Sequence, residues 1–332
     1  MHTDLTISED PAAWNATTCA LPGHGIYQAW SWGEWQSARG VMVRRYSALR
    51  SGQPVAAASV ELRRLRQLPW STAYIPAGPL WQTVADLGAF LALLLPELRA
   101  QGALSLRLSP LRPPSEDPFP TLVSTRVAER PALPRLTWRV DLRPGRDTVF
   151  TQMMPNTRRR VRQAARQGVE IKEASLGDLH HLYEWLAATA QRRALQLLSA
   201  ADLRSMLATW QRHGDGAYYL AWHEGHPCAG VICSYFGDEA LGHFIGDDQR
   251  HRTGPSVVQA LYWHCIDEAI RHGCSFIDFG SIGPADDDPL RSFKRQFGGF
   301  ACAYQPERVL RLRPVLHTAL TLLSGGRLNQ RL

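Results

Sequence analysis

Two lysines stand out in this sequence because nearly every other basic side chain is arginine. Lys172 and Lys294 are the two lysines among 37 basic residues, which leaves 35 arginines (37 − 2). A lysine ammonium is compact and gives up its proton when it is buried, whereas a guanidinium stays charged. Each lysine is therefore a candidate for chemistry that needs a point cation or a titratable amine.

The densest basic cluster falls in one predicted helix, residues 156–167, for which Asn156 is the expected N-cap. Arg158, Arg162 and Arg166 recur every four residues and predict one cationic stripe. Like charges this close repel one another unless an anion compensates them, which favours a phosphate-bearing ligand. A solvated helix surface is the alternative interpretation.

The overall composition excludes disordered and fibrous proteins. The chain has 332 residues, of which 45% are hydrophobic and 20% charged, as expected for a folded protein of about two domains. No apolar run approaches the ~20 residues of a membrane helix, and the N-terminus lacks a signal-peptide pattern, so we expect a cytoplasmic protein. The net charge of +7 suits an anionic partner such as nucleic acid or a phosphorylated substrate.

The cysteines and histidines predict neither disulfides nor a metal site. The six cysteines are scattered, without a CxxC pair, and are expected to be buried thiols. His223 and His226 flank an expected hairpin turn at Glu224-Gly225, and the sequence contains no HExxH helix. No metal is therefore expected.

The elements that would position these side chains fall into two halves of similar pattern. We predict an α+β fold of two domains, each a mostly antiparallel mixed sheet flanked by helices. The first domain is placed at 1–146 and the second at 147–305. The segment 306–332 is expected to pack back onto the first domain, and contact of this basic, partly apolar segment with an anionic membrane is the alternative. The expected strands are 41–49, 55–62, 103–108, 169–173, 218–224, 228–236, 240–245 and 276–279, and the expected helices are 83–101, 156–167, 179–190, 200–213, 256–272 and 289–297.

The second half follows the element order of the N-acetyltransferase (GNAT) fold. One loop indicates whether this half could bind acyl-CoA, the usual acyl donor of that fold. That fold binds coenzyme A pyrophosphate with consecutive backbone N–H groups in a Q/R-x-x-G-x-G/A loop at a helix start. The matching segment, 251–256, keeps Gly254 but has Pro255, which lacks an N–H, and ends in Ser256. We therefore expect an acyl donor other than acyl-CoA, and no cofactor.

Several short segments, taken together, resemble the FemABX-type aminoacyltransferases, which build the interpeptide bridge of peptidoglycan. The resemblance extends over nearly the whole chain and implies two GNAT-like domains. It also implies transfer of Gly, Ala or Ser from aminoacyl-tRNA to the diamino acid of a UDP-linked or lipid-linked muramyl peptide. The implied enzyme is a monomer in the cytoplasm, with peripheral contact to the inner face of the membrane as a further expectation. The segments are Gly23-His24…Gln28…Trp32-Gly33-Glu34, Tyr74-Ile75-Pro76-Ala77-Gly78-Pro79, Asn156-Thr157-Arg158…Arg162-Gln163-Ala164…Gly168-Val169, Ile277-Asp278-Phe279-Gly280 and Phe293-Lys294…Phe297-Gly298.

The resemblance implies roles for individual residues. Lys294 would be the electrostatic catalyst that stabilises the oxyanion formed when an amine attacks the tRNA ester. Phe293 would pack near the terminal adenosine. The expected tRNA-binding residues come from the helix of Lys294 and from the arginine stripe. They are Phe293, Lys294, Arg291, Arg295, Arg158 and Arg162. The expected substrate-binding residues are Gln36, Tyr74, Arg192, Arg193 and Asp278, with a structural capping role as the alternative for Asp278.

Three positions depart from the family pattern. Ala77 and Gln36 stand where the family often has Arg and Lys, which leaves the kind of muramyl carrier open. Ser109 stands where an acidic residue is common, so no general base is assigned. The alternatives to a bridge-building enzyme are an aminoacyl-tRNA–protein transferase, a GNAT-type acyltransferase acting on a polysaccharide, and a non-catalytic module that binds tRNA or the cell envelope through the arginine stripe.

Overall fold

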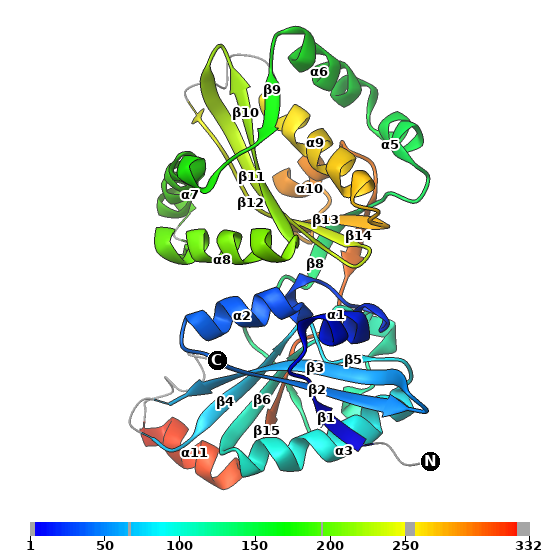
Figure 1. Ribbon diagram of the computed structural model, residues 1–332, viewed down its shortest axis with the longest axis vertical. Helices are drawn as coiled ribbons and strands as arrows, with labels where there is room; N and C mark the ends of the chain where they lie inside the picture. The colour runs from blue at the N-terminus through cyan, green and yellow to red at the C-terminus, as the bar shows by residue number, and fades with distance from the viewer. Residues whose placement is uncertain (1–3, 66–67, 194, 250–255, 324–332) are drawn as a thin grey trace. The chain divides into compact units, whose positions relative to one another are not determined.

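The chain divides into two compact units, each with its own sheet and core (Figure 1). Unit 2 is the continuous segment Leu136–Cys302, whereas unit 1 combines Met1–Arg135 with Ala303–Leu332. The computed structural model describes residues 4–65, 68–193, 195–249 and 256–323.

The sheet of unit 1 has the strand order β1-β2-β3-β4-β6-β15-β7, with β5 paired to β3. Strands β1 to β4 are antiparallel neighbours, and β4 and β6 are parallel because α3 carries the chain from one end of the pair to the other. Strand β15, from the end of the chain, lies antiparallel to β6. The strand bounds are β1 Asp4–Ile7, β2 Met42–Arg50, β3 Gln53–Arg64, β4 Ser71–Pro76, β5 Leu80–Trp81, β6 Ala103–Ser109, β7 Arg126–Val127 and β15 Arg308–Arg311.

Helices cover both faces of this sheet, with α1 and α2 on one face and α3 and α11 on the other (Figure 1). Helix α3 begins at a capping box in which Thr83 and Asp86 bond each other's backbone N–H. Its buried Leu87, Phe90 and Leu94 recur at helical spacing and pack on the sheet. The helix bounds are α1 Pro11–Cys19, α2 Trp30–Ala38, α3 Val84–Ala100, α4 Phe119–Leu122 and α11 Pro314–Leu323.

The sheet of unit 2 has the strand order β14-β8-β13-β12-β11-β10-β9. Strands β9 to β12 are antiparallel neighbours, β12 and β13 are parallel, and β8 is antiparallel to β13. The turn between β10 and β11 is Glu224-Gly225, both with positive φ, as a two-residue hairpin requires. The strand bounds are β8 Leu136–Asp141, β9 Glu170–Glu173, β10 Gly216–His223, β11 His226–Phe236, β12 Glu239–Asp247, β13 Phe276–Ser281 and β14 Phe300–Ala303.

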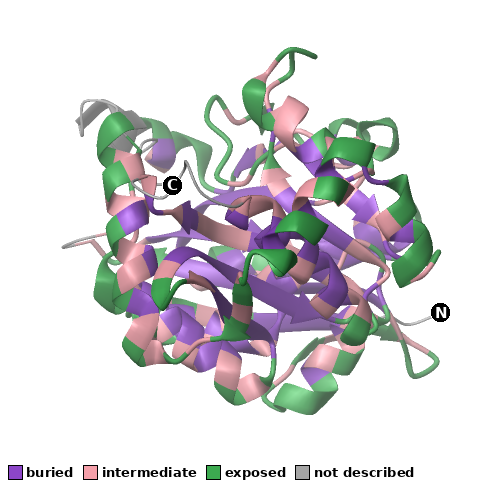
Figure 2. Ribbon diagram, turned by 90° about the horizontal axis from the view of Figure 1, so that it is seen from above, coloured by how far each residue is buried: buried purple, intermediate pink, exposed green. Residues whose placement is uncertain are grey.

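Helices α7 and α8 cover one face of this sheet, and α6 and α9 cover the other (Figure 1). Buried positions run along the strands and the inward sides of the helices (Figure 2). Helix α9 contributes Leu261, Cys265 and Ala269 to the core at helical spacing, and Gly273 follows its end with φ of 76°. The helix bounds are α5 Arg146–Gln152, α6 Pro155–Arg166, α7 Leu179–Arg193, α8 Ala200–His213, α9 Val257–Arg271 and α10 Pro289–Arg295.

The two units repeat one order of elements. In each, antiparallel strands lead through a helix to a parallel strand, and an antiparallel strand from a distant part of the chain lies on the far side of that parallel strand. The predicted α+β fold of two helix-flanked mixed sheets is confirmed. Within the described residues, no helix has both the length and the hydropathy to cross a membrane.

The structure differs from the sequence analysis at both ends of the second domain and at the start of one helix. Residues 303–305 were placed in the second domain but belong to unit 1. Residues 136–146 were placed in the first domain, but β8 pairs with β13 and belongs to unit 2. Asn156 is not the N-cap of α6, because Pro155 occupies the first helical position and Met154 precedes it.

Candidate active site

Lys294 is a buried ammonium in unit 2. It lies on α10, its side chain is only 5% exposed, and Nζ donates a hydrogen bond to the carbonyl oxygen of Ser281 at 2.7 Å. Burial lowers the pKa of Lys294 to about 8, against the opposing effect of the carboxylates of Asp278 and Asp288. In the described part of the chain, Ser281 O is the one hydrogen-bond acceptor of Nζ, so the ammonium keeps donors for another oxygen.

Two carboxylates shape the loop between β13 and α10. Asp278 accepts hydrogen bonds from Thr137 Oγ1 at 2.7 Å and from Gly280 N at 2.6 Å. Asp288 is the N-cap of α10 and accepts from Arg291 N at 2.8 Å and Gly283 N at 3.1 Å. These backbone N–H groups hold the pKa of Asp288 below its usual value. The two carboxylates frame the segment that faces Lys294.

The strand pair beside Lys294 is open at its carboxyl end. Strands β12 and β13 pair over Glu239–Leu241 and Phe276–Asp278 only, after which β12 continues to Asp247 without β13. The β11–β12 register also shifts at this point, leaving His243 as the extra residue of a bulge. The last residue of β13 is Ser281, the hydrogen-bond partner of Lys294. The carboxyl ends of adjacent parallel strands are common places for binding sites in α/β folds.

The corresponding strand pair in unit 1 is closed. Strands β4 and β6 remain paired as far as Pro76 and Ser109, and Ser109 N then donates to Gly78 O at 3.0 Å. The side chain of Gln28 donates to Pro76 O and accepts from Ser59 N. The Tyr74–Pro79 segment therefore covers the carboxyl end of the β4–β6 pair in unit 1. Within the described residues, the carboxyl end of the corresponding β12–β13 pair in unit 2 has no such cover from its own paired strands.

The residues around Lys294 on α10 point in two directions. Phe293 packs against Tyr262 and Phe297, with ring centroids 5.1 and 5.5 Å away, so its described neighbours are the aromatic core. Arg291 forms an ion pair with Asp286 at 2.9 Å, and Arg295 is exposed. The packing partners of Phe293 anchor α10, and its predicted contact with adenosine stays a prediction.

In the arginine stripe of α6, Arg162 and Arg166 are exposed and Arg158 is half-buried, and the helix adjoins the end of α10. Gln296 accepts hydrogen bonds from Met154 N at 3.0 Å through its carbonyl oxygen and from Thr157 Oγ1 at 3.3 Å through its side chain. Arg158 donates to Thr151 O, and the guanidinium of Arg162 lies 5.1 Å from the Phe150 ring. In the sequence from 148 to 169 there is no acidic residue to balance the five arginines. Unit 2 thus carries a cationic surface next to the helix of Lys294.

Three other predicted residues lie outside this cluster. Arg192, at the end of α7, bonds Thr189, Ala188 O and Gln249, and the side chain of Arg193 falls outside the described residues. Gln36 is 3% exposed in unit 1, and its Oε1 accepts from Arg39 at 3.4 Å. Their substrate-binding roles stay predictions.

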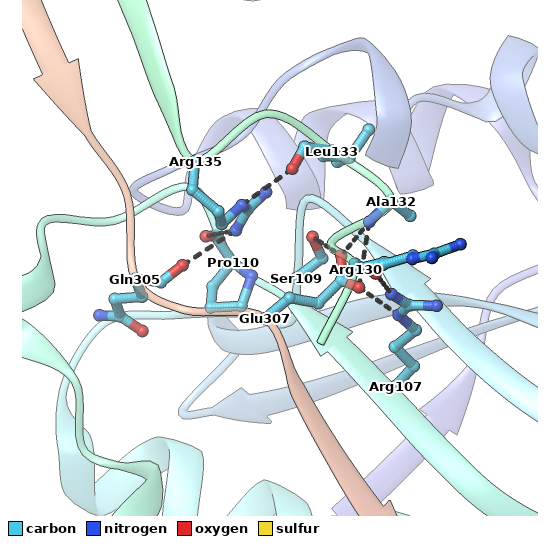
Figure 3. A network of polar contacts seen from close by, with 9 residues as sticks. All are labelled: Arg107, Ser109, Pro110, Arg130, Ala132, Leu133, Arg135, Gln305 and Glu307. Atoms are coloured by element: carbon cyan, nitrogen blue, oxygen red, sulfur yellow. Dashed lines mark hydrogen bonds and ion pairs between the residues drawn. The ribbon is translucent and has the colours of Figure 1, made fainter. Parts of the chain in front are cut away.

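Tyr74 lies on β4 beside a buried polar network of unit 1. Glu307 at the centre of that network accepts hydrogen bonds from Arg107, Ser109 Oγ and Ala132 N (Figure 3). Burial, together with the nearby Glu307 charge, raises the pKa of Tyr74. The phenol therefore stays protonated at all ordinary pH values, and its role toward substrate stays a prediction.

Sequence reasoning missed the groups that hold Lys294 in place, namely Thr137, Ser281, Asp288 and Gln296. Thr137 is separated from Asp278 by 141 residues, so no local pattern could pair them. Asp288 directly before Pro289 is a helix-start signal present in the sequence itself. The loop with Gly254 and Pro255, on which the donor argument depended, lies outside the described residues, and the described part shows no cluster of metal-ligating side chains.

Comparisons with known proteins agree with this architecture. A family model described as an acetyltransferase (GNAT) domain matches residues 152–295, all of them in unit 2. A crystal structure of FemX matches with a TM-score of 0.85 and 15% identity, covering 96% of this chain and 99% of its own. No curated protein matches the sequence.

Two further solved structures match less closely. A tandem GNAT protein from the clavulanic acid biosynthesis pathway has a TM-score of 0.54 at 15% identity, covering 94% of this chain and 99% of its own. The C-terminal domain of a putative lysylphosphatidylglycerol synthetase from Agrobacterium fabrum has a TM-score of 0.52 at 12% identity, covering 96% and 98%.

The chain has the fold of a tandem GNAT protein, and its unit 2 matches an acetyltransferase (GNAT) domain. More particularly, the chain has the fold of FemX over nearly its whole length. The fold implied by the FemABX resemblance is thereby confirmed.

Proposed function

We propose that this protein is a FemABX-type aminoacyltransferase, which moves an amino acid from aminoacyl-tRNA to an amino group of a peptidoglycan precursor in the cytoplasm. The observation that carries the proposal is the buried ammonium of Lys294 at the open end of the β12–β13 pair, with donors left for an incoming oxygen. The FemX fold supports the same class of reaction.

The chemistry follows from the charge that develops during transfer. The acceptor amine attacks the ester carbonyl carbon, a C–N bond forms, and negative charge gathers on the carbonyl oxygen. The ammonium of Lys294 stabilises this oxyanion, since a buried cation acts strongly on a nearby charge where water is excluded. The C–O bond to the terminal ribose then breaks, and the proton of the amine passes to the ribose oxygen, directly or through water.

The cationic surface of α6 fits the donor. Arg158 and Arg162 lie on a helix tied to α10 through Gln296, and phosphate groups of an RNA strand would compensate their mutual repulsion. Arg295 extends the same charge on α10 itself. The acceptor is proposed to be a UDP-linked or lipid-linked muramyl peptide. Gln36 and Tyr74 in unit 1, and Arg192 and Arg193 in unit 2, are separate candidates for contact with it.

The test is transfer of a radiolabelled amino acid from charged tRNA to a muramyl pentapeptide. Lys294→Ala should lower kcat by about 100-fold or more, as loss of one oxyanion donor does in other enzymes. Lys172→Ala is the matched control, because Lys172 is the other lysine and pairs with Glu170 on the exposed strand β9. Unchanged transfer by Lys294→Ala would remove Lys294 from the site. Transfer from acyl-CoA, or to a protein N-terminus, would instead support the alternative acyltransferases.

A further inference from the structure

The carboxylate of Asp278 is engaged inside the protein by both of its oxygens. Oδ2 accepts from Thr137 Oγ1 at 2.7 Å, and Oδ1 accepts from Gly280 N at 2.6 Å. The side chain is also buried, with 9% of the residue exposed. These two hydrogen bonds and the burial hold the carboxylate in one place, which favours a role within the protein.

These hydrogen bonds fix a bend at the end of β13. The pairing of β13 with β8 is regular up to Asp278 and shifts register before Ser281. Gly280 has φ of 76°, a conformation that favours glycine, and its N–H is the one held by Asp278. The bend presents the carbonyl of Ser281 to Nζ of Lys294 at 2.7 Å. The position of the ammonium therefore depends on the carboxylate two residues before the bend.

The charges that act on Lys294 come from two sides. Asp278 on β13 and Asp288 before α10 both favour its charged form against burial. The neighbouring charges on the other elements are already paired, Arg291 with Asp286 and Arg139 of β8 with Glu239 of β12. Asp278 thus serves the ammonium twice, through the bend and through its charge.

We propose that Asp278, held by Thr137, is a positioning residue that sets the place of the Lys294 ammonium through the bend at Gly280 and does not bind substrate. This inference deepens the proposed function and rests on it for the catalytic consequence, while the structural consequence stands by itself.

The test follows the ammonium directly. Because the sequence has two lysines, lysine labelled with ¹³C at Cε gives two signals, and Lys172 is the internal reference. In Asp278→Asn the pKa of Lys294 should fall below its wild-type value of about 8, because one of the two carboxylates that favour the cation is removed. Thr137→Val removes the hydrogen bond to the Asp278 carboxylate and should broaden or shift the Lys294 signal. Thr137→Ser keeps a hydroxyl and should give the wild-type Lys294 signal.

Activity provides the second readout. Asp278→Asn should lower kcat by about tenfold with little change in the acceptor KM, since the oxyanion contact is made in the transition state. An unmoved Lys294 signal combined with a raised acceptor KM would overturn the inference and make Asp278 a substrate ligand. A shifted Lys294 signal in a protein without transfer activity would instead keep the positioning role and refute the proposed function. If Asp278→Asn fails to fold, the Lys294 signal in the variants Thr137→Val and Thr137→Ser tests the positioning role instead.

Discussion

At the scale of single residues, Lys294 is held in a state that costs stability. A buried lysine with a pKa of about 8 is partly deprotonated near neutral pH, whereas in the unfolded chain it is fully charged. Its folded pKa is lowered, so the unfolded state binds more protons and stability rises as pH increases between the folded and unfolded values. The lost stability is the cost of keeping a titratable hydrogen-bond donor, Lys294 Nζ, buried beside the carbonyl oxygen of Ser281.

The same pKa predicts the pH dependence of transfer. As pH rises through about 8 the Lys294 cation is lost, so kcat/KM of the wild type should fall on the alkaline side. Lys294→Arg keeps its charge, because the pKa of arginine is above ~12, and its smaller activity should stay level there. The measurement is kcat/KM for transfer across the range in which the tRNA ester survives. An equal alkaline fall in both proteins would assign the titration to another group.

At the scale of elements, the motif around α10 is explained mainly by packing. Phe297 is fully buried and its ring stacks on that of Tyr262, with ring centroids 4.9 Å apart. This contact fixes α10 so that Lys294 faces β13. Gly299 follows with φ of 84°, and a Cβ there would collide with the carbonyl of Arg139 on β8. The glycine is therefore required for the close approach of the chain to β8.

This predicts a graded effect of alanine at two glycines. Gly145 has the same φ of 84°, with ψ of 163° and open space around it, so Gly145→Ala should cost only the conformational strain, about 1–3 kcal/mol. Gly299→Ala adds the backbone collision and should lower the free energy of unfolding by at least ~1 kcal/mol more. Urea unfolding of both variants measures the difference. Equal losses would show that β8 yields to the added methyl group.

The α6 helix predicts salt-dependent binding of RNA. Replacing Arg158, Arg162 and Arg166 by Gln should weaken binding of a tRNA acceptor stem and reduce the slope of log K against log salt by about 0.7–0.9 for each lost phosphate contact. Fluorescence anisotropy over a salt series is the measurement. The control has the same charge change on three exposed arginines of unit 1, Arg44, Arg64 and Arg311. An unchanged slope in the α6 variant would show that RNA binds to a surface other than α6.

At the scale of the whole molecule, the two units differ in how the chain builds them. Unit 2 is one continuous segment, whereas unit 1 takes residues 303–332 from the far end of the chain. This segment contains β15 and, just before it, the buried Glu307 that pairs with Arg107 (Figure 3). Without that segment Arg107 would be a buried charge without its carboxylate, which typically costs 3–5 kcal/mol.

Dissection of the chain should therefore give opposite results for the two units. Residues 136–302 are expected to unfold cooperatively by themselves, and residues 1–135 are not. Because Tyr304 N donates to Arg135 O at 2.8 Å, a short glycine linker between 135 and 303 should restore a folded unit 1. Circular dichroism and thermal unfolding of the three proteins measure this. Cooperative unfolding of 1–135 alone would show that β15 is dispensable.

The pattern of the sequence was sufficient for most regular elements. The hairpin at Glu224-Gly225 and helices α3 and α8 follow from turn residues, caps and apolar spacing, which are local properties. Helices α1 and α2 were not predicted. Helix α2 carries Trp30, Trp32 and Trp35 at spacings that match no single helix face, and no side chain caps its start.

The sequence by itself determined the local chemistry of this protein: which cations are lysine, where five arginines fall on one helix, and where many of the strands and helices lie. These properties depend on residues a few positions apart. Only the tertiary structure decided that Lys294 is buried against Ser281, that Thr137 holds Asp278, and that the parallel strand pair is open in unit 2 and closed in unit 1. Each of these depends on where distant segments meet, because burial and pairing set both the pKa of a side chain and the space beside it.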